Sequence, residues 1–291
     1  MPETESKAPK GVPVLKLSSP ATREYWEIPV LFEDEHLLAL AKPSGLLTSP
    51  DRYDPDRPNL MRLLHAHVAR GVPWARERGL AYLANAHRLD FETSGVILLA
   101  RSKPVLVALA NLFGAEKPRK TYLAIAENHP EEDAFDVDAS LAPDPVRLGR
   151  MRVSHKHGKK SRTSFRVLDR FVGFTLLEAR PHTGRTHQIR VHLAWVNQPI
   201  VGDLLYGGRP LKLSSFKRGY RKPRHRPEQP LIGRVALHAS VLELDHPITG
   251  APIRIECPLP RDFAVSVKYL RRFALPGGPV APESDDATEE D

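Results

Sequence analysis

The feature that most constrains the fold is a series of short apolar runs joined in pairs by tight turns. Residues 161–181 contain two such runs around "RFVG", and residues 235–260 contain two more around "HPITG". A third pair flanks "EDEH" within residues 29–45. Short runs of this kind, bounded by turn residues, are typical of β-hairpins, whose strands pair antiparallel. The pattern therefore predicts a mainly antiparallel sheet.

Four other segments have apolar residues at helical spacing and are interspersed with the strands. They are residues 59–71, 102–117, 186–198 and 261–274. Ser102 begins the second of them and is the predicted N-cap. Further strands are predicted at residues 95–101 and 120–128. Strands joined by short turns, with helices between them, predict the α+β class.

The length of 291 residues suits one large domain or two medium ones, and 41% hydrophobic residues are enough for a core. The chain has no apolar run of about 18 residues, the length that a membrane span needs, and no apolar signal segment at its start. Its single cysteine, Cys257, excludes an internal disulfide. We therefore expect a cytoplasmic protein with a disordered arm at residues 1–27, one body at 28–274 and an acidic, disordered tail at 275–291.

The charge is unevenly distributed. Residues 275–291 contain six acidic residues and no lysine or arginine, so without them the net charge of +8 becomes +14 for residues 1–274. A strongly basic body favours a polyanionic partner, most often a nucleic acid. A well-solvated surface is the alternative explanation.

Two segments concentrate the basic charge. Residues 146–163 hold seven lysines and arginines and no acid, among them Lys156, Lys159 and Lys160. Residues 207–230 hold eight lysines and arginines and the single acid Glu228. The basic residues include Arg218, Arg221, Arg224 and Arg226, and the same segment contains the aromatic residues Phe216 and Tyr220. Cations neutralise phosphates and aromatic rings stack on unpaired bases, so we interpret both segments as RNA-binding loops rather than merely solvated ones.

A lone carboxylate stands in "HRLDFETSG", residues 87–95. If "AHRLD" ends a strand, Arg88 and Asp90 point to one face, and His87 and Leu89 to the other. Asp90 would then lie where a strand meets a loop, a common position for catalytic groups. The alternative is a structural Asx-turn, in which Asp90 bonds to a nearby backbone amide.

A second polar cluster lies at residues 179–194. It contains three arginines and three histidines, namely Arg180, Arg185, Arg190, His182, His187 and His192. Histidines five residues apart lie about 140° apart around a helix, whereas paired metal ligands prefer a spacing of four. We therefore predict no metal site and assign the histidines to polar packing or RNA contact. Arg190, about one turn into the predicted helix, is expected to pair with an acid that spacing alone does not identify.

These stretches carry a family resemblance. "HRLDFETSGVILLAR" closely resembles the "HRLDxxTSG" motif of the RluA family of pseudouridine synthases. Further motifs of that family are similar, in the same order, to "KPSGLLT" (residues 42–48), "KTY" (120–122), "TGRTHQIRVHL" with "PIVGDLLYG" (183–207), and "LHA" (237–239). The resemblance covers about residues 28–260, nearly the whole predicted body.

The resemblance implies a long, mixed but mainly antiparallel sheet, split by a central catalytic cleft and flanked by helices. It also implies that uridine in RNA is isomerised to pseudouridine without a cofactor. Asp90 matches the catalytic aspartate, which acts as a nucleophile or as a base at C2′. Tyr122 matches a tyrosine that packs against the target base, and Leu237 matches an apolar residue that lines the pocket. Arg190 matches the arginine that pairs with the aspartate, and Arg88 matches the arginine that fills the space of the flipped uridine. Arg185 and His187 match residues that position the RNA or the helix of Arg190.

The expected partner is a stem-loop of ribosomal or transfer RNA, because paired A-form RNA exposes little sequence information. Many family members carry a small RNA-binding domain before the catalytic one, and 27 residues are too few for it. We therefore expect residues 207–230 to contribute specificity. Nothing in the sequence points to an obligate protein partner.

Two other functions are compatible with the same residues. A non-catalytic RNA-binding or assembly factor would keep the fold and the basic surface but would not need Asp90. A hydrolase that releases a base or a sugar usually requires two carboxylates, and Glu92 is the nearest candidate for the second. Free uracil released from RNA would identify the hydrolase.

Overall fold

The computed structural model describes residues 13–51, 54, 56–221 and 226–276. Within these residues one sheet has 11 strands, with the order β1-β2-β3-β5-β12-β6-β11-β10-β7, β13 beside β12 and β4 beside β5. The strands of this sheet are β1 Val14–Ser19, β2 Glu24–Glu33, β3 Leu37–Lys42, β4 Ala84–Asn85, β5 Ser94–Ala100, β6 Arg119–Glu127, β7 Ala134–Asp138, β10 Arg162–Phe171, β11 Phe174–Pro181, β12 Leu237–Asp245 and β13 Pro252–Glu256. A small separate hairpin pairs β8 Leu141–Pro143 with β9 Met151–Val153. The predicted α+β class is confirmed.

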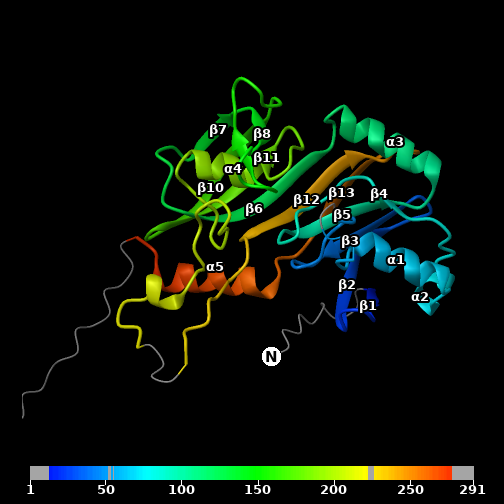
Figure 1. Ribbon diagram of the computed structural model, residues 1–291, viewed down its shortest axis with the longest axis horizontal. Coiled ribbons are helices and arrows are strands. Elements are labelled where there is room, and N and C mark those ends of the chain that lie inside the picture. The colour runs from blue at the N-terminus through cyan, green and yellow to red at the C-terminus, as the bar shows by residue number, and fades with distance from the viewer. Residues whose placement is uncertain (1–12, 52–53, 55, 222–225, 277–291) are drawn as a thin grey trace, which may run out of the picture.

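The helices lie outside the sheet, as predicted. They are α1 Leu60–Ala69, α2 Pro73–Glu77, α3 Lys103–Gly114, α4 Gln188–Trp195 and α5 Arg261–Phe273, with a 3-10 turn η1 at Leu213–Ser215. In Figure 1, α1 and α2 lie near β1–β3 at one end of the sheet, whereas α4 lies near β8 and β11 at the other. The predicted N-cap is confirmed, since the Ser102 side chain accepts a hydrogen bond from the backbone amide of Val105 at the start of α3.

The sheet is antiparallel except at its middle, where β5 and β12 run parallel. Only two residue pairs join them, His238 to Ser94 and Ala239 to Gly95. The approach is so close that a Cβ on Gly95, whose φ is +124°, would lie 2.2 Å from the carbonyl oxygen of Ala239. Only glycine is compatible with this contact, which explains the last residue of "TSG". The short parallel contact is the seam between the two halves of the sheet.

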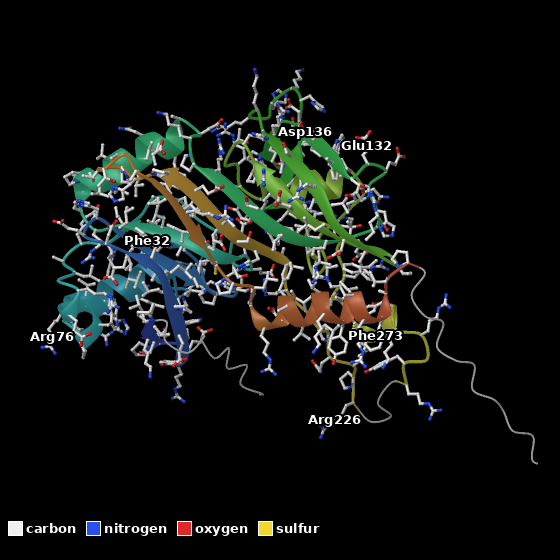
Figure 2. The ribbon with its side chains drawn as sticks, turned by 180° about the vertical axis from the view of Figure 1, so that it is seen from behind. Phe32, Arg76, Glu132, Asp136, Arg226 and Phe273 are labelled. Carbon is white, nitrogen blue, oxygen red and sulfur yellow. The ribbon has the colours of Figure 1, made fainter. Side chains whose placement is uncertain are left out.

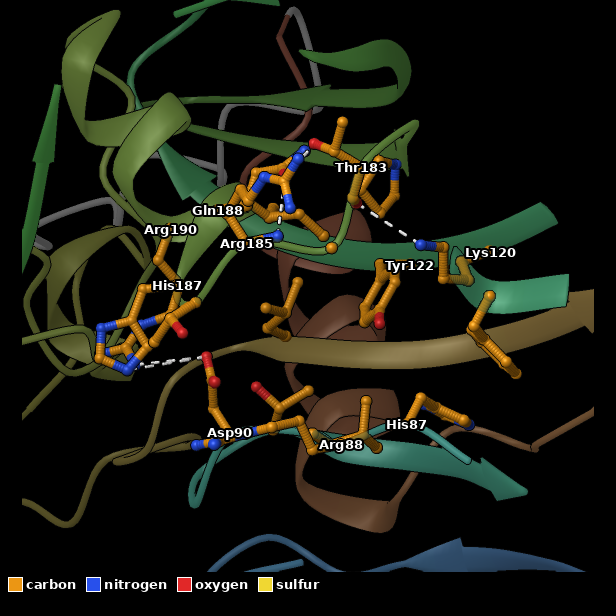
Figure 3. Close-up of a pocket in the computed structure, with 18 of the residues that line it drawn as sticks. His87, Arg88, Asp90, Lys120, Tyr122, Thr183, Arg185, His187, Gln188 and Arg190 are labelled. Atoms are coloured by element: carbon orange, nitrogen blue, oxygen red, sulfur yellow. Dashed lines mark hydrogen bonds and ion pairs between the residues drawn. The ribbon is translucent and has the colours of Figure 1, made fainter. Parts of the chain in front are cut away.

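The two faces of the sheet near this seam have different coverings. His238 packs its ring against Phe263 of α5, with the ring centroids 6.5 Å apart. Its neighbour Leu237 points to the opposite face, because successive strand residues alternate. Helix α5 therefore covers one face, and the face of Leu237 is left for the site described below (Figure 3).

The prediction that residues 1–27 form a disordered arm is wrong for its second half. Residues 14–19 form β1, and β2 begins at Glu24. Leu15 and Leu17 are fully buried in the same cluster as Leu64 of α1. The alternation of leucine with polar residues is only six residues long, too short to predict a strand without its partner β2. Residues 1–12 and most of the predicted acidic tail, residues 277–291, lie outside the described residues.

None of the helices in the described part of the chain is both long and apolar enough to cross a membrane.

Candidate active site

A cavity of about 340 Å³ lies at the seam of the sheet. Its walls come from the loop between β4 and β5, from β6 and β12, and from residues 181–190, which lead into α4 (Figure 3). All seven residues that the sequence predicts at the catalytic and base-binding positions line it, namely Arg88, Asp90, Tyr122, Arg185, His187, Arg190 and Leu237. Folding therefore brings together residues that are up to 149 positions apart in the chain, from Arg88 to Leu237.

Asp90 lies in a loop and not at the end of a strand. Strand β4 ends at Asn85, and residues 87–90 all line the cavity, so the expected alternation of faces is wrong. The loop is held by hydrogen bonds from Thr48 and from β5. The Thr48 hydroxyl donates to the Leu89 carbonyl at 3.0 Å and accepts from the Leu89 amide at 3.1 Å, and the Leu98 amide donates to His87 Nε2 at 3.1 Å. These bonds replace the sheet contacts that a strand would have made.

Lys42 joins the "KPSG" segment to the same loop. Its amine is buried, and it donates to the carbonyls of Pro43 at 2.8 Å, Leu46 at 2.6 Å and Phe91 at 3.4 Å. Burial lowers the pKa of Lys42 to about 7, and the nearby negative charge of Asp90 opposes this shift. Because Phe91 directly follows Asp90, the lysine fixes the backbone beside the carboxylate.

Arg190 pairs with Asp90, as predicted, but Asp203 is its closer partner. An Arg190 terminal nitrogen lies 3.5 Å from Asp90 Oδ2. Asp203 accepts two hydrogen bonds from the guanidinium, from Nε at 2.7 Å and from Nη2 at 2.8 Å. Burial by itself lowers the pKa of Arg190, but the hydrogen bonds and charge of Asp203, together with Asp90, raise it above the ordinary value. The arginine is therefore always charged.

Sequence reasoning missed Asp203, although the "PIVGDLLYG" motif contains it. The turn that presents it depends on Gly202, which has a φ of +77° and whose added Cβ would lie 2.0 Å from the Arg234 carbonyl oxygen. The side chain of Asp203 is 1% exposed and that of Arg190 is 6% exposed. A buried guanidinium paired only with the partly exposed Asp90, at 3.5 Å, would be poorly compensated. The need for a second, buried acid is the signal in the sequence that points to Asp203.

Tyr122 and Leu237 form adjacent parts of the cavity wall, on the neighbouring strands β6 and β12. Burial, with a smaller contribution from the charge of Asp90, raises the pKa of Tyr122 well above its ordinary value. The phenol is therefore neutral at physiological pH. The tyrosine ring and the leucine side chain give the cavity an apolar wall suited to a flat base.

His187 faces the same oxygen of Asp90 as Arg190 does, and it lies directly before α4. Its Nε2 is 3.9 Å from Asp90 Oδ2. The backbone of His187 has a φ of +55°, a left-handed conformation that is uncommon for histidine. This conformation delays the start of the helix to Gln188, two residues after the predicted start at Thr186.

The rim of the cavity is cationic. Arg88, Lys120 and Arg185 line it, whereas Asp90 and Glu116 are the only carboxylates among its described lining residues. Lys120 donates to the Thr183 carbonyl at 3.5 Å, and burial lowers its pKa. A positive rim around one inner carboxylate favours an anionic ligand whose reacting part enters the cavity.

Glu92 does not line the cavity. Burial raises the pKa of its carboxyl group, and its own backbone carbonyl accepts from Arg234 at 3.3 Å. The hydrolase interpretation needs a second carboxylate in the cavity with Asp90, and Glu92 is not among the residues that line it.

The two basic segments lie in different places. Lys156, Lys159 and Lys160 are exposed between β9 and β10, and Arg185 at the cavity donates from Nε to the Lys160 carbonyl at 3.1 Å. The second segment instead reaches α5 at Lys217, whose amine lies 4.7 Å from the centre of the Phe273 ring. Figure 1 shows this segment beyond the end of α5, and Figure 2 shows Arg226 well below that helix. Arg218, Arg221 and Arg226 are exposed, and Arg224 lies outside the described residues.

The histidines of residues 182–192 have separate polar partners. His192 is fully buried and makes hydrogen bonds with Ser161, Thr163 and the Ala139 carbonyl, while His182 bonds to Ser164. The polar packing expected of the histidines is confirmed for these two. The described residues contain no group of three or more His, Cys, Asp or Glu side chains placed to hold a metal ion.

Comparison with known proteins agrees with this site. The family described as RNA pseudouridylate synthase matches residues 36–195. Ribosomal large subunit pseudouridine synthase D of Xylella fastidiosa is 37% identical over 253 residues, which cover 83% of this chain and 69% of the relative. The protein of the same name from Xanthomonas campestris is 36% identical over 269 residues, 89% of this chain and 74% of the relative.

Solved structures show the same fold. Human RNA pseudouridylate synthase domain containing 4 superposes with a TM-score of 0.62 at 25% identity, covering 83% of this chain and 92% of the human one. Human RNA pseudouridylate synthase domain containing 1 has a TM-score of 0.59 at 22% identity, covering 86% and 96%. From its motifs, its sheet, its cavity and these relatives, the chain belongs to the RluA family of RNA pseudouridine synthases.

Proposed function

We propose that this RNA pseudouridine synthase isomerises uridine in large-subunit ribosomal RNA, with Asp90 as the catalytic carboxylate. The observation that carries the proposal is the position of Asp90, a single inner carboxylate that faces Arg190 and His187 within a cationic rim. The names of the relatives, ribosomal large subunit pseudouridine synthase, favour ribosomal over transfer RNA.

The reaction is an isomerisation, so it needs no group that the residues of the cavity lack. The C1′–N1 bond of uridine breaks, uracil turns, and C5 bonds to C1′. C5 then loses its proton, and N1 gains one. Asp90 acts as a nucleophile at the sugar or the base, or as a base at C2′, and in each of these roles the carboxylate faces the positive charge of Arg190. Tyr122 and Leu237 hold the uracil ring while it turns.

The target uridine has to leave its stack to reach Asp90, which costs a few kcal/mol. In this proposal Arg88, exposed at the rim, occupies the space that the base leaves. Phosphate contacts from Lys156, Lys159, Lys160 and Arg185 offset the cost of opening the RNA.

The test of this function uses the purified protein with separate transcripts of large-subunit rRNA, small-subunit rRNA and transfer RNA. We expect pseudouridine, measured by mass spectrometry of digested RNA, to form at specific positions of the large-subunit transcript and no uracil to be released. Formation only in transfer RNA would refute the assignment of the substrate, and free uracil would indicate a hydrolase. Tight RNA binding without any pseudouridine would indicate the assembly factor.

A second prediction compares the two basic segments. The triple variants Lys156→Ala/Lys159→Ala/Lys160→Ala and Arg218→Ala/Arg221→Ala/Arg226→Ala each remove three positive charges. Because only the first set is connected to the cavity rim, through Arg185, we expect it to weaken binding more strongly and to lower the slope of log K against log salt by about two. Fluorescence titration of labelled RNA at several salt concentrations measures both. A larger effect of the second set would instead support the expected role of residues 207–230 in specificity.

A further inference from the structure

A chain of close polar contacts runs from strand β9 to Asp90 and passes through Tyr206. The Met151 backbone amide donates to the Tyr206 hydroxyl at 2.8 Å. The same hydroxyl lies 2.8 Å from Nδ1 of His187, whose Nε2 is 3.9 Å from Asp90 Oδ2. Tyr206 does not line the cavity, and its hydroxyl reaches Asp90 through the His187 ring.

The chemistry of the donors gives this chain a direction. A backbone amide only donates, so the phenol oxygen accepts from Met151 and its own proton is left for His187. Burial raises the pKa of Tyr206 to about 12, so the proton is retained at neutral pH. Nδ1 of His187 is therefore the acceptor nitrogen, and in the neutral ring Nε2 carries the proton and directs it toward Asp90.

The surroundings of His187 favour that neutral ring. Burial lowers the pKa of His187. The charged groups that face the ring act in opposite directions, since Asp90 and Asp203 raise its pKa, whereas Arg190 and Arg88 lower it. Asp90 thus faces one permanent positive charge, on Arg190, and one neutral N–H group, on His187.

Tyr206 is itself rigidly held. Its side chain is buried, and its ring lies edge-on to the His187 ring, with the centroids 5.7 Å apart at 84°. The guanidinium carbons of Arg190 and Arg150 lie 5.1 Å and 5.5 Å from the centre of the tyrosine ring. His187 precedes the helix and has a left-handed backbone conformation, so the orientation of its ring depends on its side-chain contacts. The rigidly held phenol of Tyr206 supplies one of these contacts.

We propose that Tyr206 is a positioning residue, whose hydroxyl fixes the tautomer and the direction of the His187 ring so that an N–H group faces Asp90. In the opposite tautomer, a nitrogen lone pair would face the carboxylate and repel it. The proposal rests on the proposed function of Asp90. It also links the carboxylate to β9, since Met151 lies within the basic segment of residues 146–163.

The first test does not depend on activity. Nitrogen-15 NMR of histidine-labelled protein distinguishes protonated from unprotonated ring nitrogens, and His187→Ala assigns the signals of His187. We expect Nδ1 of His187 to be unprotonated and Nε2 protonated between pH 6 and 8, and Tyr206→Phe to give a mixture of tautomers. A protonated Nδ1 in the wild type, or an unchanged tautomer in Tyr206→Phe, would overturn the proposal.

The second test measures how the hydroxyl contributes to the reaction. At saturating RNA we expect Tyr206→Phe to lower kcat for pseudouridine formation about tenfold, with KM within about twofold, since a misdirected group affects the chemical step. In a His187→Ala background the same substitution should lower kcat less than about twofold, because an effect that passes through His187 disappears with it. An equal loss in both backgrounds would assign Tyr206 a purely structural role.

The matched control is Tyr269→Phe, which removes a hydroxyl from a half-buried tyrosine of α5 that stacks on Phe273. It should leave both kcat and the His187 signals unchanged. If the wild type forms no pseudouridine, the proposed function fails, and the NMR result still decides the contact between Tyr206 and His187.

Discussion

We expect Asp90→Asn to lower kcat for pseudouridine formation by at least about 10⁴-fold, the scale of loss seen when a nucleophile is removed. The amide has nearly the shape of the carboxylate, but it is neither a nucleophile nor a base at neutral pH. RNA affinity stays within about threefold of the wild type, because the phosphate contacts come from the rim and the basic segments and not from Asp90. Kinetics on the large-subunit transcript and titration of the same RNA measure the two effects separately.

The control for this substitution is Asp245→Asn, at the exposed end of β12. It makes the same chemical change outside the cavity and should retain full activity. If Asp90→Asn kept more than a tenth of the wild-type rate, Asp90 would not be the catalytic carboxylate. If the wild type formed no pseudouridine, and if Asp90→Asn bound RNA as tightly as the wild type does, a non-catalytic assembly factor would be the better interpretation.

Asp203→Ala has the largest expected effect on stability. Removing one partner of a buried ion pair leaves the other charge uncompensated, which typically costs 3–5 kcal/mol, so we expect a loss of about that size in the free energy of unfolding. Arg190 would also lose the two hydrogen bonds that hold its guanidinium against Asp203, and would no longer be held beside Asp90. Urea unfolding followed by circular dichroism measures the stability, and the rRNA assay measures the activity.

Asp169→Ala is the comparison for Asp203→Ala. It breaks the ion pair with Arg271, whose side chain is 58% exposed, and should cost only about 0–1 kcal/mol. Asp203→Asn tests the activity in a better-folded protein, because the amide oxygen still accepts from Arg190 while the negative charge is lost. Equal stability of the Asp203→Ala and Asp169→Ala variants would show that Asp203 is not the main partner of Arg190.

Local sequence patterns predicted most of the elements of the fold. The hairpins β2–β3, β10–β11 and β12–β13 follow from apolar runs that flank short turns, and the start of α3 follows from Ser102. The strand β1 was missed because Leu15 and Leu17 indicate a buried face only once β2 lies beside them. Local sequence does not predict the loop of Asp90, because the hydrogen bonds that shape it come from Thr48, which is 41 residues away in sequence.

The sequence by itself determined the family motifs, the basic surface and the residues that converge on the cavity. Only the tertiary structure decided that Arg190 is shared between Asp90 and Asp203, that Tyr206 meets His187, and that Lys217 contacts Phe273 of α5. The physical reason is that periodicity reports which face of its own element a side chain occupies. The distance between side chains on different elements depends instead on turns such as the one at Gly202, where the close approach of two backbone segments sets the geometry.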